Sequence, residues 1–361
     1  MRGGERVIEA LLDIYPAADI FTHVYVPEAV SERIRARTVR TTFINRLPRA
    51  ARWYRSYLPL MPLALEALDL SGYDLVISSE SGPAKGVLAP SAALHVCYCH
   101  SPMRYLWDFY HRYRQEAGPA ARLSMPLLCH YLRMWDVTSA ARVDAFAANS
   151  VNVARRIGRA YGRQDVTVLP APIRACEFDP GRPRGDRYLF VGELVGYKQP
   201  ETALAACLAL DRPLTIIGGG PLLDRLRRLA RGRDVEVLGR QPDAVVREHL
   251  STCRALLFPG EEDFGLVPVE AMASGAPVIA SARGGALETV VHGETGILYP
   301  GDTVAALQEA ILAFERAPAM APERLAARAA LFDLARFRAK FTAFVEASRI
   351  ARDARLDPVD G

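Results

Sequence analysis

The pattern that most constrains this sequence is an alternation of short apolar runs of strand length with longer segments of helical periodicity. The alternation recurs through most of the 361 residues. It is typical of parallel sheets that are covered by helices on both faces. The strand candidates form two sets, at 19–26, 39–44, 73–79, 93–99, 143–148 and 166–169, and at 187–191, 213–217, 234–238, 254–258 and 277–280.

Helical periodicity fills the spaces between these runs. The final helical segment, 334–351, places Phe337, Phe341 and Phe344 on one side, which predicts that it packs against a core. The remaining predicted helices lie at 4–14, 49–69, 121–140, 150–161, 199–210, 222–231 and 243–251.

A polar stretch without periodicity separates the two sets of strands. It begins at Pro170-Ala171-Pro172 and continues through the Pro/Gly-rich residues 179–186. Such a segment is typical of a domain boundary. We therefore predict two doubly wound α/β domains, 1–175 and 186–333, followed by a helix and tail at 334–361. Ligands of such domains bind at the carboxyl ends of the strands.

Composition narrows the class of protein. Hydrophobic residues make up 50% and charged residues 24%, which is ordinary for a soluble globular chain. No apolar run is long enough to cross a bilayer. The six cysteines form no CxxC pair, so we expect reduced thiols and a cytoplasmic location. A net charge of +4 gives no reason to expect a nucleic-acid partner.

The most informative stretch is 258–280. A buried strand ends in an acidic loop, Gly265 breaks the chain, and Pro268 is predicted at the first position of a helix, with Glu270 in its first turn. The free N–H groups around Phe264, Gly265 and Leu266 suit a phosphate or sugar oxygen. An isolated glutamate is more often a solvated residue, but here spacing and strand context act together.

Glu262 and Glu270, separated by seven residues around Phe264-Gly265-Leu266, resemble the paired-glutamate motif of retaining GT-B glycosyltransferases of family 4, the glycosyl transferases group 1. The segment His100–Asp108 resembles a bacterial mannosyltransferase-like branch of that family. The resemblance covers nearly the whole chain. It implies the GT-B fold: two Rossmann-like domains with the ligand cleft between them and a C-terminal helix that returns to the first domain.

The resemblance also implies roles for individual residues. Glu270 would accept hydrogen bonds from both ribose hydroxyls, and Glu262 would contact the transferred sugar. Lys198, in a loop after a strand, would neutralise the departing diphosphate. His100, at the carboxyl end of strand 93–99, would face the sugar. The backbone of Phe264, Gly265 and Leu266, together with Gly219 and Arg240, would hold the donor, while Gly3, Gly4 and Arg104 would lie near the diphosphate or the acceptor.

Two departures from the family pattern bear on activity. The family commonly has Arg where this chain has Glu193, and a carboxylate there would repel a diphosphate unless it pointed away or a cation such as Arg283 compensated. Gly3 and Gly4 resemble the glycine-rich loop that normally follows the first strand of the first domain. No strand precedes them here, so we expect the first sheet to lack a central strand.

The expected function is a retaining, metal-independent transfer of a hexose, with mannose favoured, in bacterial polysaccharide biosynthesis. The donor would be GDP-mannose or a UDP-sugar, and the acceptor a glycan or a polyprenyl-diphosphate-linked saccharide. We expect no cofactor and no metal site, because the strand ends carry no obvious DxD-type motif. Two alternatives stay open: a sugar-nucleotide epimerase of the same fold, and an inactive nucleotide-sugar-binding homologue.

Basic residues are unevenly distributed. Of the 45, only Lys85, Lys198 and Lys340 are lysines. Eight arginines and no acid lie between Arg33 and Arg55, with aromatic residues among them. This segment predicts an anionic membrane surface as a partner and a peripheral location at the inner face of the plasma membrane. The alternative is a solvated surface in a chain whose genome favours arginine.

Overall fold

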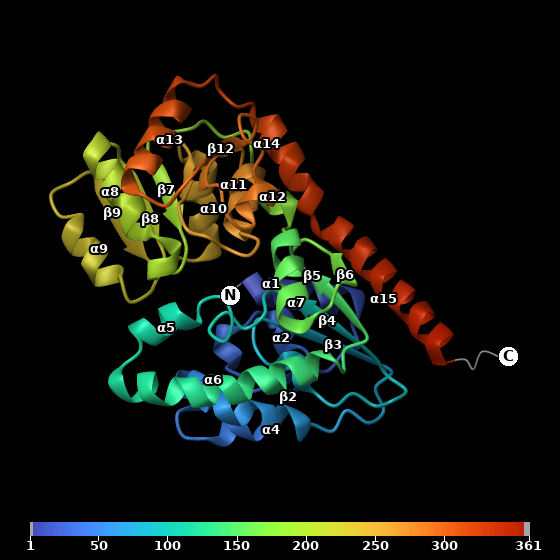
Figure 1. The fold of residues 1–361 in the computed structure, drawn as a ribbon. Helices are drawn as coiled ribbons and strands as arrows, with labels where there is room; N and C mark the ends of the chain where they lie inside the picture. The colour runs from blue at the N-terminus through green and yellow to red at the C-terminus, as the bar shows by residue number, and fades with distance from the viewer. Residues whose placement is uncertain (1–2, 357–361) are drawn as a thin grey trace. The chain divides into compact units, whose positions relative to one another are not determined.

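The computed structural model describes residues 3–356, and the chain divides into two compact units (Figure 1). The first unit comprises the residues up to Pro170 together with those from Phe337 onward. The second unit is Ala171–Arg336. Each unit is built around a parallel sheet with helices packed against it, which confirms the predicted two-domain α/β class.

The main sheet of the first unit has four parallel strands in the order β3-β4-β5-β6. Every side chain of β4 is buried, as expected for a central strand that is covered on both faces. Because β4 pairs in parallel with β3 and β5, the carboxyl ends of these three strands lie side by side. The strands are β3 (Leu75–Glu80), β4 (Leu94–Cys99), β5 (Ala145–Ala148) and β6 (Val166–Val168).

A separate two-stranded parallel sheet completes this unit. It pairs β1 (Ile20–Thr22) with β2 (Val39–Thr41). Side chains connect it to the start of β3, since Tyr73 donates to Asp19 and the Phe21 and Tyr73 rings meet edge to face at 5.7 Å. Among the described residues, no strand pairs β1 with β3.

Local signals explain the long helices of the first unit. The Ser150 hydroxyl caps α7 (Val151–Tyr161) by accepting from the Val153 N–H, and Gly162 ends the helix in the left-handed conformation. In α15 (Leu334–Leu356), Phe337 packs against Tyr98 at 5.7 Å between ring centroids. The predicted return of the C-terminal helix to the first domain is thus confirmed. The other long helices are α1 (Gly3–Ile14) and α6 (Pro119–Ala140).

The prediction of one helix over 49–69 is wrong. The chain instead forms α3 (Ala50–Trp53), a 3-10 segment at Tyr54–Leu60 and α4 (Met61–Glu66). Two prolines, Pro59 and Pro62, lack the N–H that a continuous helix would use. Two short helices were missed, α2 (Glu32–Arg35) and α5 (Tyr110–Glu116).

The second unit contains a six-stranded parallel sheet in the order β12-β11-β10-β7-β8-β9. The order reverses at β7, so this is a doubly wound sheet, with β7 beside β10 at the switch point. Five strands match the predicted ones, and β12 was missed. The strands are β7 (Tyr188–Val191), β8 (Leu214–Ile217), β9 (Val235–Gly239), β10 (Leu256–Phe258), β11 (Val278–Ser281) and β12 (Gly296–Tyr299).

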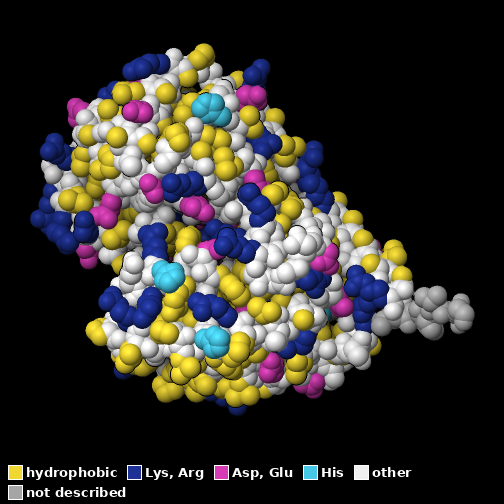
Figure 2. Space-filling view, in the orientation of Figure 1, with side chains coloured by type: hydrophobic (Ala, Val, Ile, Leu, Met, Phe, Trp, Pro, Cys, Tyr) yellow, Lys and Arg dark blue, Asp and Glu magenta, His cyan; other side chains and the backbone are white. Residues whose placement is uncertain are grey.

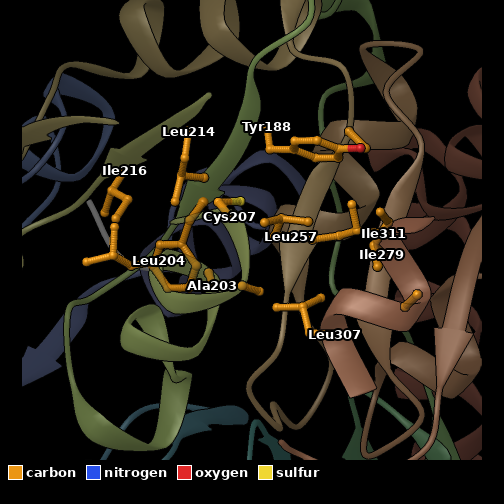
Figure 3. Packing of buried hydrophobic residues seen from close by; sticks show 14 of the residues in the cluster. Tyr188, Ala203, Leu204, Cys207, Leu214, Ile216, Leu257, Ile279, Leu307 and Ile311 are labelled. Atoms are coloured by element: carbon orange, nitrogen blue, oxygen red, sulfur yellow. The ribbon is translucent and has the colours of Figure 1, made fainter. Parts of the chain in front are cut away.

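Apolar side chains fix the helices of the second unit onto this sheet (Figure 3). Leu204 and Cys207 of α8 (Pro200–Leu210) and Ile311 of α13 (Val304–Arg316) pack against strand residues such as Leu257. This packing holds the loops at the strand ends in fixed positions. The other helices are α9 (Leu223–Leu229), α10 (Asp243–Thr252), α11 (Leu266–Ala273), α12 (Ala286–Thr289) and α14 (Pro322–Ala329).

Candidate donor site and the polar groups of the first unit

The acidic loop of the second unit connects β10 to α11. Gly265 occupies the left-handed region at φ 81°, and a Cβ there would lie 3.1 Å from the Phe258 ring. This glycine starts the helix at Leu266, two residues earlier than predicted. Pro268 is therefore the third helical residue, not the first, and Glu270 lies just beyond the first turn. Within the described part of the chain, no side-chain hydrogen bond caps the start of α11, and uncapped N–H groups of this kind suit an anion.

Lys198 and Glu262 form an ion pair at this site, with 2.7 Å between Nζ and Oε1. Glycine makes the close approach possible, because a Cβ at Gly260 would lie 2.6 Å from the Lys198 Cα. Burial opposes the charged ammonium, but the carboxylates of Glu262 and, more weakly, Glu193 outweigh it and raise the pKa of Lys198. The lysine therefore carries its charge at neutral pH.

The structure shows whether Glu193 is exposed and whether Arg283 compensates its charge. Its side chain is exposed in the loop after β7. Arg283, the cation that could have compensated it, instead forms an ion pair with Asp302 at 2.9 Å. The positive charge on this loop therefore comes from Lys198.

Glu270 is buried, with only 5% of its surface exposed. Its backbone carbonyl accepts from both the N–H and the hydroxyl of Ser274, at 3.0 and 2.9 Å, so the end of α11 is closed locally. A carboxylate in such a position is costly unless polar groups solvate it. This burial distinguishes Glu270 from a solvated helix residue.

Two glycines that the sequence analysis did not assign to the site support the acidic loop. The Gly285 N–H donates to the Glu262 carbonyl at 2.8 Å. A Cβ at Gly284 would lie 2.3 Å from that carbonyl, and one at Gly285 would lie 2.3 Å from Phe264. Because no other residue fits here, these positions hold the backbone of the loop in place.

Gly219 and Arg240 lie together, with 3.7 Å between a Cβ built on Gly219 and the Arg240 Cβ. The neighbouring glycine, Gly218, approaches the Gly192 carbonyl so closely that a Cβ would come within 1.8 Å of it. The loops after β7 and β8 therefore meet backbone to backbone. The structure thus brings Lys198, Glu262 and their glycine supports to the strand ends of the second unit.

In the first unit, His100 follows β4 at its carboxyl end, as predicted. Its Nε2 lies 2.9 Å from the Ser79 hydroxyl, and its ring meets Tyr98 edge to face at 5.1 Å. Burial lowers the pKa of His100 to about 4, so the ring is neutral at pH 7. A Cβ on Gly4 would lie 3.6 Å from the same Nε2.

The other residues predicted for the first unit are Gly3, Gly4 and Arg104. Gly3 and Gly4 form the first turn of α1, so they are helical and do not form a loop. The Arg104 guanidinium lies over the Phe109 ring at 5.3 Å. Met1 and Arg2, which precede these glycines in the sequence, lie outside the described residues.

Sequence reasoning missed a buried charge cluster in the first unit. Lys85, which has no exposed surface, forms ion pairs with Glu80 at 3.3 Å and with Asp136. Its Nζ also lies 4.6 Å from the centre of the Tyr161 ring. Burial raises the pKa of Glu80 to about 7, although Lys85 opposes the shift. The rarity of lysine in this chain was the one available hint of it.

Comparison with protein families finds a match for each unit. The family described as glycosyl transferases group 1 matches residues 178–331. The family described as glycosyltransferase family 4 matches residues 1–175. The two matches together span nearly the whole described chain.

Curated relatives align over shorter segments. A D-rhamnosyltransferase, WbpZ, from Pseudomonas aeruginosa is 34% identical over 131 residues, which are 34% of this chain and 34% of that protein. A GDP-mannose-dependent phosphatidylinositol monomannoside mannosyltransferase from Mycobacterium tuberculosis is 32% identical over 161 residues, 39% of this chain and 42% of that protein. The chain thus matches less than half the length of these relatives.

Solved structures resemble the chain over nearly its full length. A sucrose-phosphate synthase from Thermosynechococcus elongatus gives a TM-score of 0.73 at 21% identity, covering 95% of this chain and 92% of the other. The Anabaena protein HepE in complex with UDP gives 0.67 at 17% identity, covering 96% of both. At these identities the likeness establishes the fold.

Proposed function

The chain belongs to the family-4 glycosyltransferases and has their GT-B fold, and from this premise we propose that it moves a hexose from a nucleotide-diphospho-sugar to a saccharide acceptor. The observation that carries the proposal is the Lys198–Glu262 ion pair beside the start of α11. A fixed cation and free helix N–H groups suit a diphosphate.

The ion pair favours particular roles for its two members. Charge grows on the diphosphate as the bond to the sugar breaks, so a cation held in place stabilises the transition state more than the ground state. Lys198 is such a cation. Glu262 is anchored by Lys198, which suits a group that orients sugar hydroxyls more than one that attacks carbon. We therefore favour a retaining route by same-face attack, with the leaving phosphate oxygen accepting the acceptor's proton.

Mannose from GDP-mannose is the favoured hexose. The similarity to a relative that is named as GDP-mannose-dependent supports it. A UDP-sugar is the alternative, supported by a structural neighbour that holds UDP. The role we propose is in bacterial polysaccharide biosynthesis, with a glycan or a polyprenyl-diphosphate-linked saccharide as acceptor.

A two-step assay tests this function. Melting temperature is first measured with GDP-mannose, UDP-glucose and the free nucleotides, since a ligand of the folded state raises it. Release of nucleoside diphosphate is then measured with and without a lipid-linked saccharide. We expect release only when the acceptor is present. Interconversion of sugar nucleotides without acceptor would support an epimerase, and a thermal shift with no turnover would support an inactive homologue.

The role of Lys198 is tested by Lys198→Ala against Lys340→Ala, an exposed lysine of α15. We expect Lys198→Ala to lower kcat by more than tenfold with a smaller effect on donor affinity, and Lys340→Ala to change neither. A raised KM with kcat untouched would remove Lys198 from the chemical step.

A second variant tests the charge of the same loop. Glu193→Arg should raise turnover if positive charge limits the site.

We also propose reversible attachment to an anionic membrane surface. Arg49, Arg52 and Arg55 are exposed, as is Trp53. Apolar side chains also appear along the edge of the first unit where α4 and α6 lie (Figure 2). On α6 they form a stripe of helical spacing with exposed fractions up to 84%, made of Leu123, Leu127, Tyr131, Met134 and Val137. Basic and apolar groups together are typical of interfacial binding.

Two arginines of the basic segment pair with acids, Arg33 with Asp13 and Arg40 with Asp19, so the test targets the other end. Sedimentation with anionic liposomes should be strong at low salt and weak at high salt. The triple change R49E/R52E/R55E should abolish it and leave donor binding intact. Equal binding to neutral liposomes would contradict the electrostatic part. No helix of the described residues is long and apolar enough to cross a bilayer.

A further inference from the structure

A cavity of about 470 Å³ opens in the first unit, among the segment that follows His100 and the helices α6 and α7. Its volume is in the range of small-molecule sites. Part of its lining comes from the segment His100–Asp108 that the sequence singled out, but the arginines of α6 and α7 were not predicted to join it. Its walls are Pro102, Leu106, Trp107, Asp108, Tyr110 and His111, Arg133 of α6, and Arg156, Arg159 and Ala160 of α7.

The cavity carries an excess of positive charge. Three arginines line it, and its single acid, Asp108, forms an ion pair with Arg156 at 3.1 Å. Arg159 forms no ion pair with any residue that the structure describes. Figure 2 shows basic side chains and a histidine on the face of the first unit that carries α5. Two guanidinium charges are therefore left over for an anion.

Two contacts hold the Arg133 guanidinium in position at the cavity wall. Its Nε donates to the Leu106 carbonyl at 2.6 Å, and its guanidinium carbon lies 4.6 Å from the centre of the Tyr110 ring. Within the described part of the chain, its two terminal nitrogens have no hydrogen-bond partner. A guanidinium held through Nε and a ring face presents these nitrogens with little loss of entropy when an anion binds.

The wall beside the arginines is rigid and aromatic. Trp107 donates from Nε1 to Asp136 at 2.8 Å, and Asp136 is in turn held by the buried Lys85. The Trp107 ring also meets Tyr161 edge to face at 6.4 Å. The buried charge cluster thus fixes one wall of the cavity. An apolar ring wall beside cationic groups suits a ligand that joins a compact anion to a less polar body.

We propose that this cavity binds the phosphate or diphosphate group of the acceptor, with Arg133 and Arg159 as its main ligands. The inference rests on the proposed transfer to a saccharide acceptor, but the binding itself does not depend on turnover. Two sources could supply the same chemistry, a lipid-linked diphosphate or a soluble sugar phosphate. Arg156, already paired with Asp108, contributes less.

The test measures binding of inorganic pyrophosphate by calorimetry, with GDP or UDP, whichever raises the melting temperature more, present to occupy the candidate donor site. We expect R133Q/R159Q to weaken pyrophosphate binding at least tenfold. The single change Arg159→Gln, at an exposed residue, should weaken it severalfold without disturbing the fold. The matched control is Arg155→Gln, an exposed arginine of the same helix that does not line the cavity, and it should stay within twofold of the unchanged protein.

Equal affinity in all variants would overturn the proposal, as would complete displacement of pyrophosphate by the nucleotide alone. A short-chain polyprenyl diphosphate that binds more tightly than pyrophosphate, with the same dependence on Arg133 and Arg159, would identify the lipid-linked source. If the short-chain polyprenyl diphosphate and pyrophosphate bind with equal affinity, the cavity recognises the anion alone. If the variants lose pyrophosphate binding while no transferase activity is found for any donor, the cavity proposal stands and the proposed function fails.

Discussion

The two units hold their polar groups in different ways. In the second unit, the candidate donor site is built by one continuous loop and helix, together with Lys198, and glycines bring the backbones together. In the first unit, Lys85 meets Asp136 across 51 residues of sequence. A site formed by local backbone leaves a pattern in the sequence, whereas one formed by distant side chains does not. If this contrast also separates stability from binding, changes to the first unit's cluster should alter unfolding, and changes to the second unit's loop and helix should alter ligand affinity.

The largest effect is expected from Lys85→Met. The change keeps most of the stem but leaves Glu80 and Asp136 buried without their cation. Removing one partner of a buried ion pair costs about 3–5 kcal/mol. We expect the unfolding free energy, measured with urea, to fall by this amount. That is a large share of the roughly 5–15 kcal/mol that stabilises most domains.

The matched control for this variant is Lys340→Met, a change of the same type at an exposed position of α15. It should alter the unfolding free energy by less than about 0.5 kcal/mol. The triple change K85M/E80Q/D136N should recover part of the loss, because it removes the uncompensated charges. If Lys85→Met and Lys340→Met unfold at the same urea concentration, the cluster does not stabilise the first unit.

A smaller effect, on binding, is expected from Glu270→Ala in the second unit. If the buried carboxylate accepts from two ribose hydroxyls, its loss should cost about 2 kcal/mol, or roughly 30-fold in donor affinity. Calorimetry with the nucleotide sugar measures this. The exposed Glu294 provides the control, since Glu294→Ala should leave affinity unchanged. Unaltered affinity in Glu270→Ala would take this residue out of the donor site.

Features that lie within one short segment could be predicted from the sequence, and features formed by distant residues could not. The Glu262–Glu270 spacing, Gly265 and the helix start lie within one short segment, so local rules located them and erred only by two residues at Pro268. Gly284 and Gly285 support the same loop from elsewhere in the chain, and no local rule links them to it. The arginines of the cavity come from α6 and α7, and only the folded chain brings them together. The helix predicted over 49–69 failed because periodicity was given more weight than its prolines.

The pH dependence of stability should be set in part by two groups of the first unit that act in opposite directions, the partly buried His100 and the buried Glu80. Burial lowers the pKa of His100 to about 4, below its usual value near 6.5. Its contribution to stability is therefore complete above pH 6.5 and is lost as the pH falls towards 4. Burial raises the pKa of Glu80 to about 7, so its contribution is present at low pH and is lost as the pH rises through 7.

Urea unfolding at pH 7 and pH 5 separates the two groups. His100→Asn should lose less stability on acidification than the unchanged protein, by about 1–2 kcal/mol. Glu80→Gln should lose more, because it lacks a group that takes up a proton in the folded state. The same pH dependence in all three proteins would mean that neither group titrates as its burial implies.

The smallest effect is expected from metal removal, and it tests the second unit alone. Glu262 stabilises the charge of Lys198, and in the proposed function this charge does at the diphosphate what a divalent cation would do. The described residues contain no group of three or more His, Cys, Asp or Glu side chains placed to hold a metal ion. EDTA or added Mg²⁺ should therefore change the transfer rate by less than twofold. In Lys198→Ala, where that charge is missing, Mg²⁺ bound to the donor phosphates should restore part of the rate. Loss of wild-type activity in EDTA and recovery with Mn²⁺ would contradict this, since Lys198 would then not be the group that neutralises the leaving diphosphate.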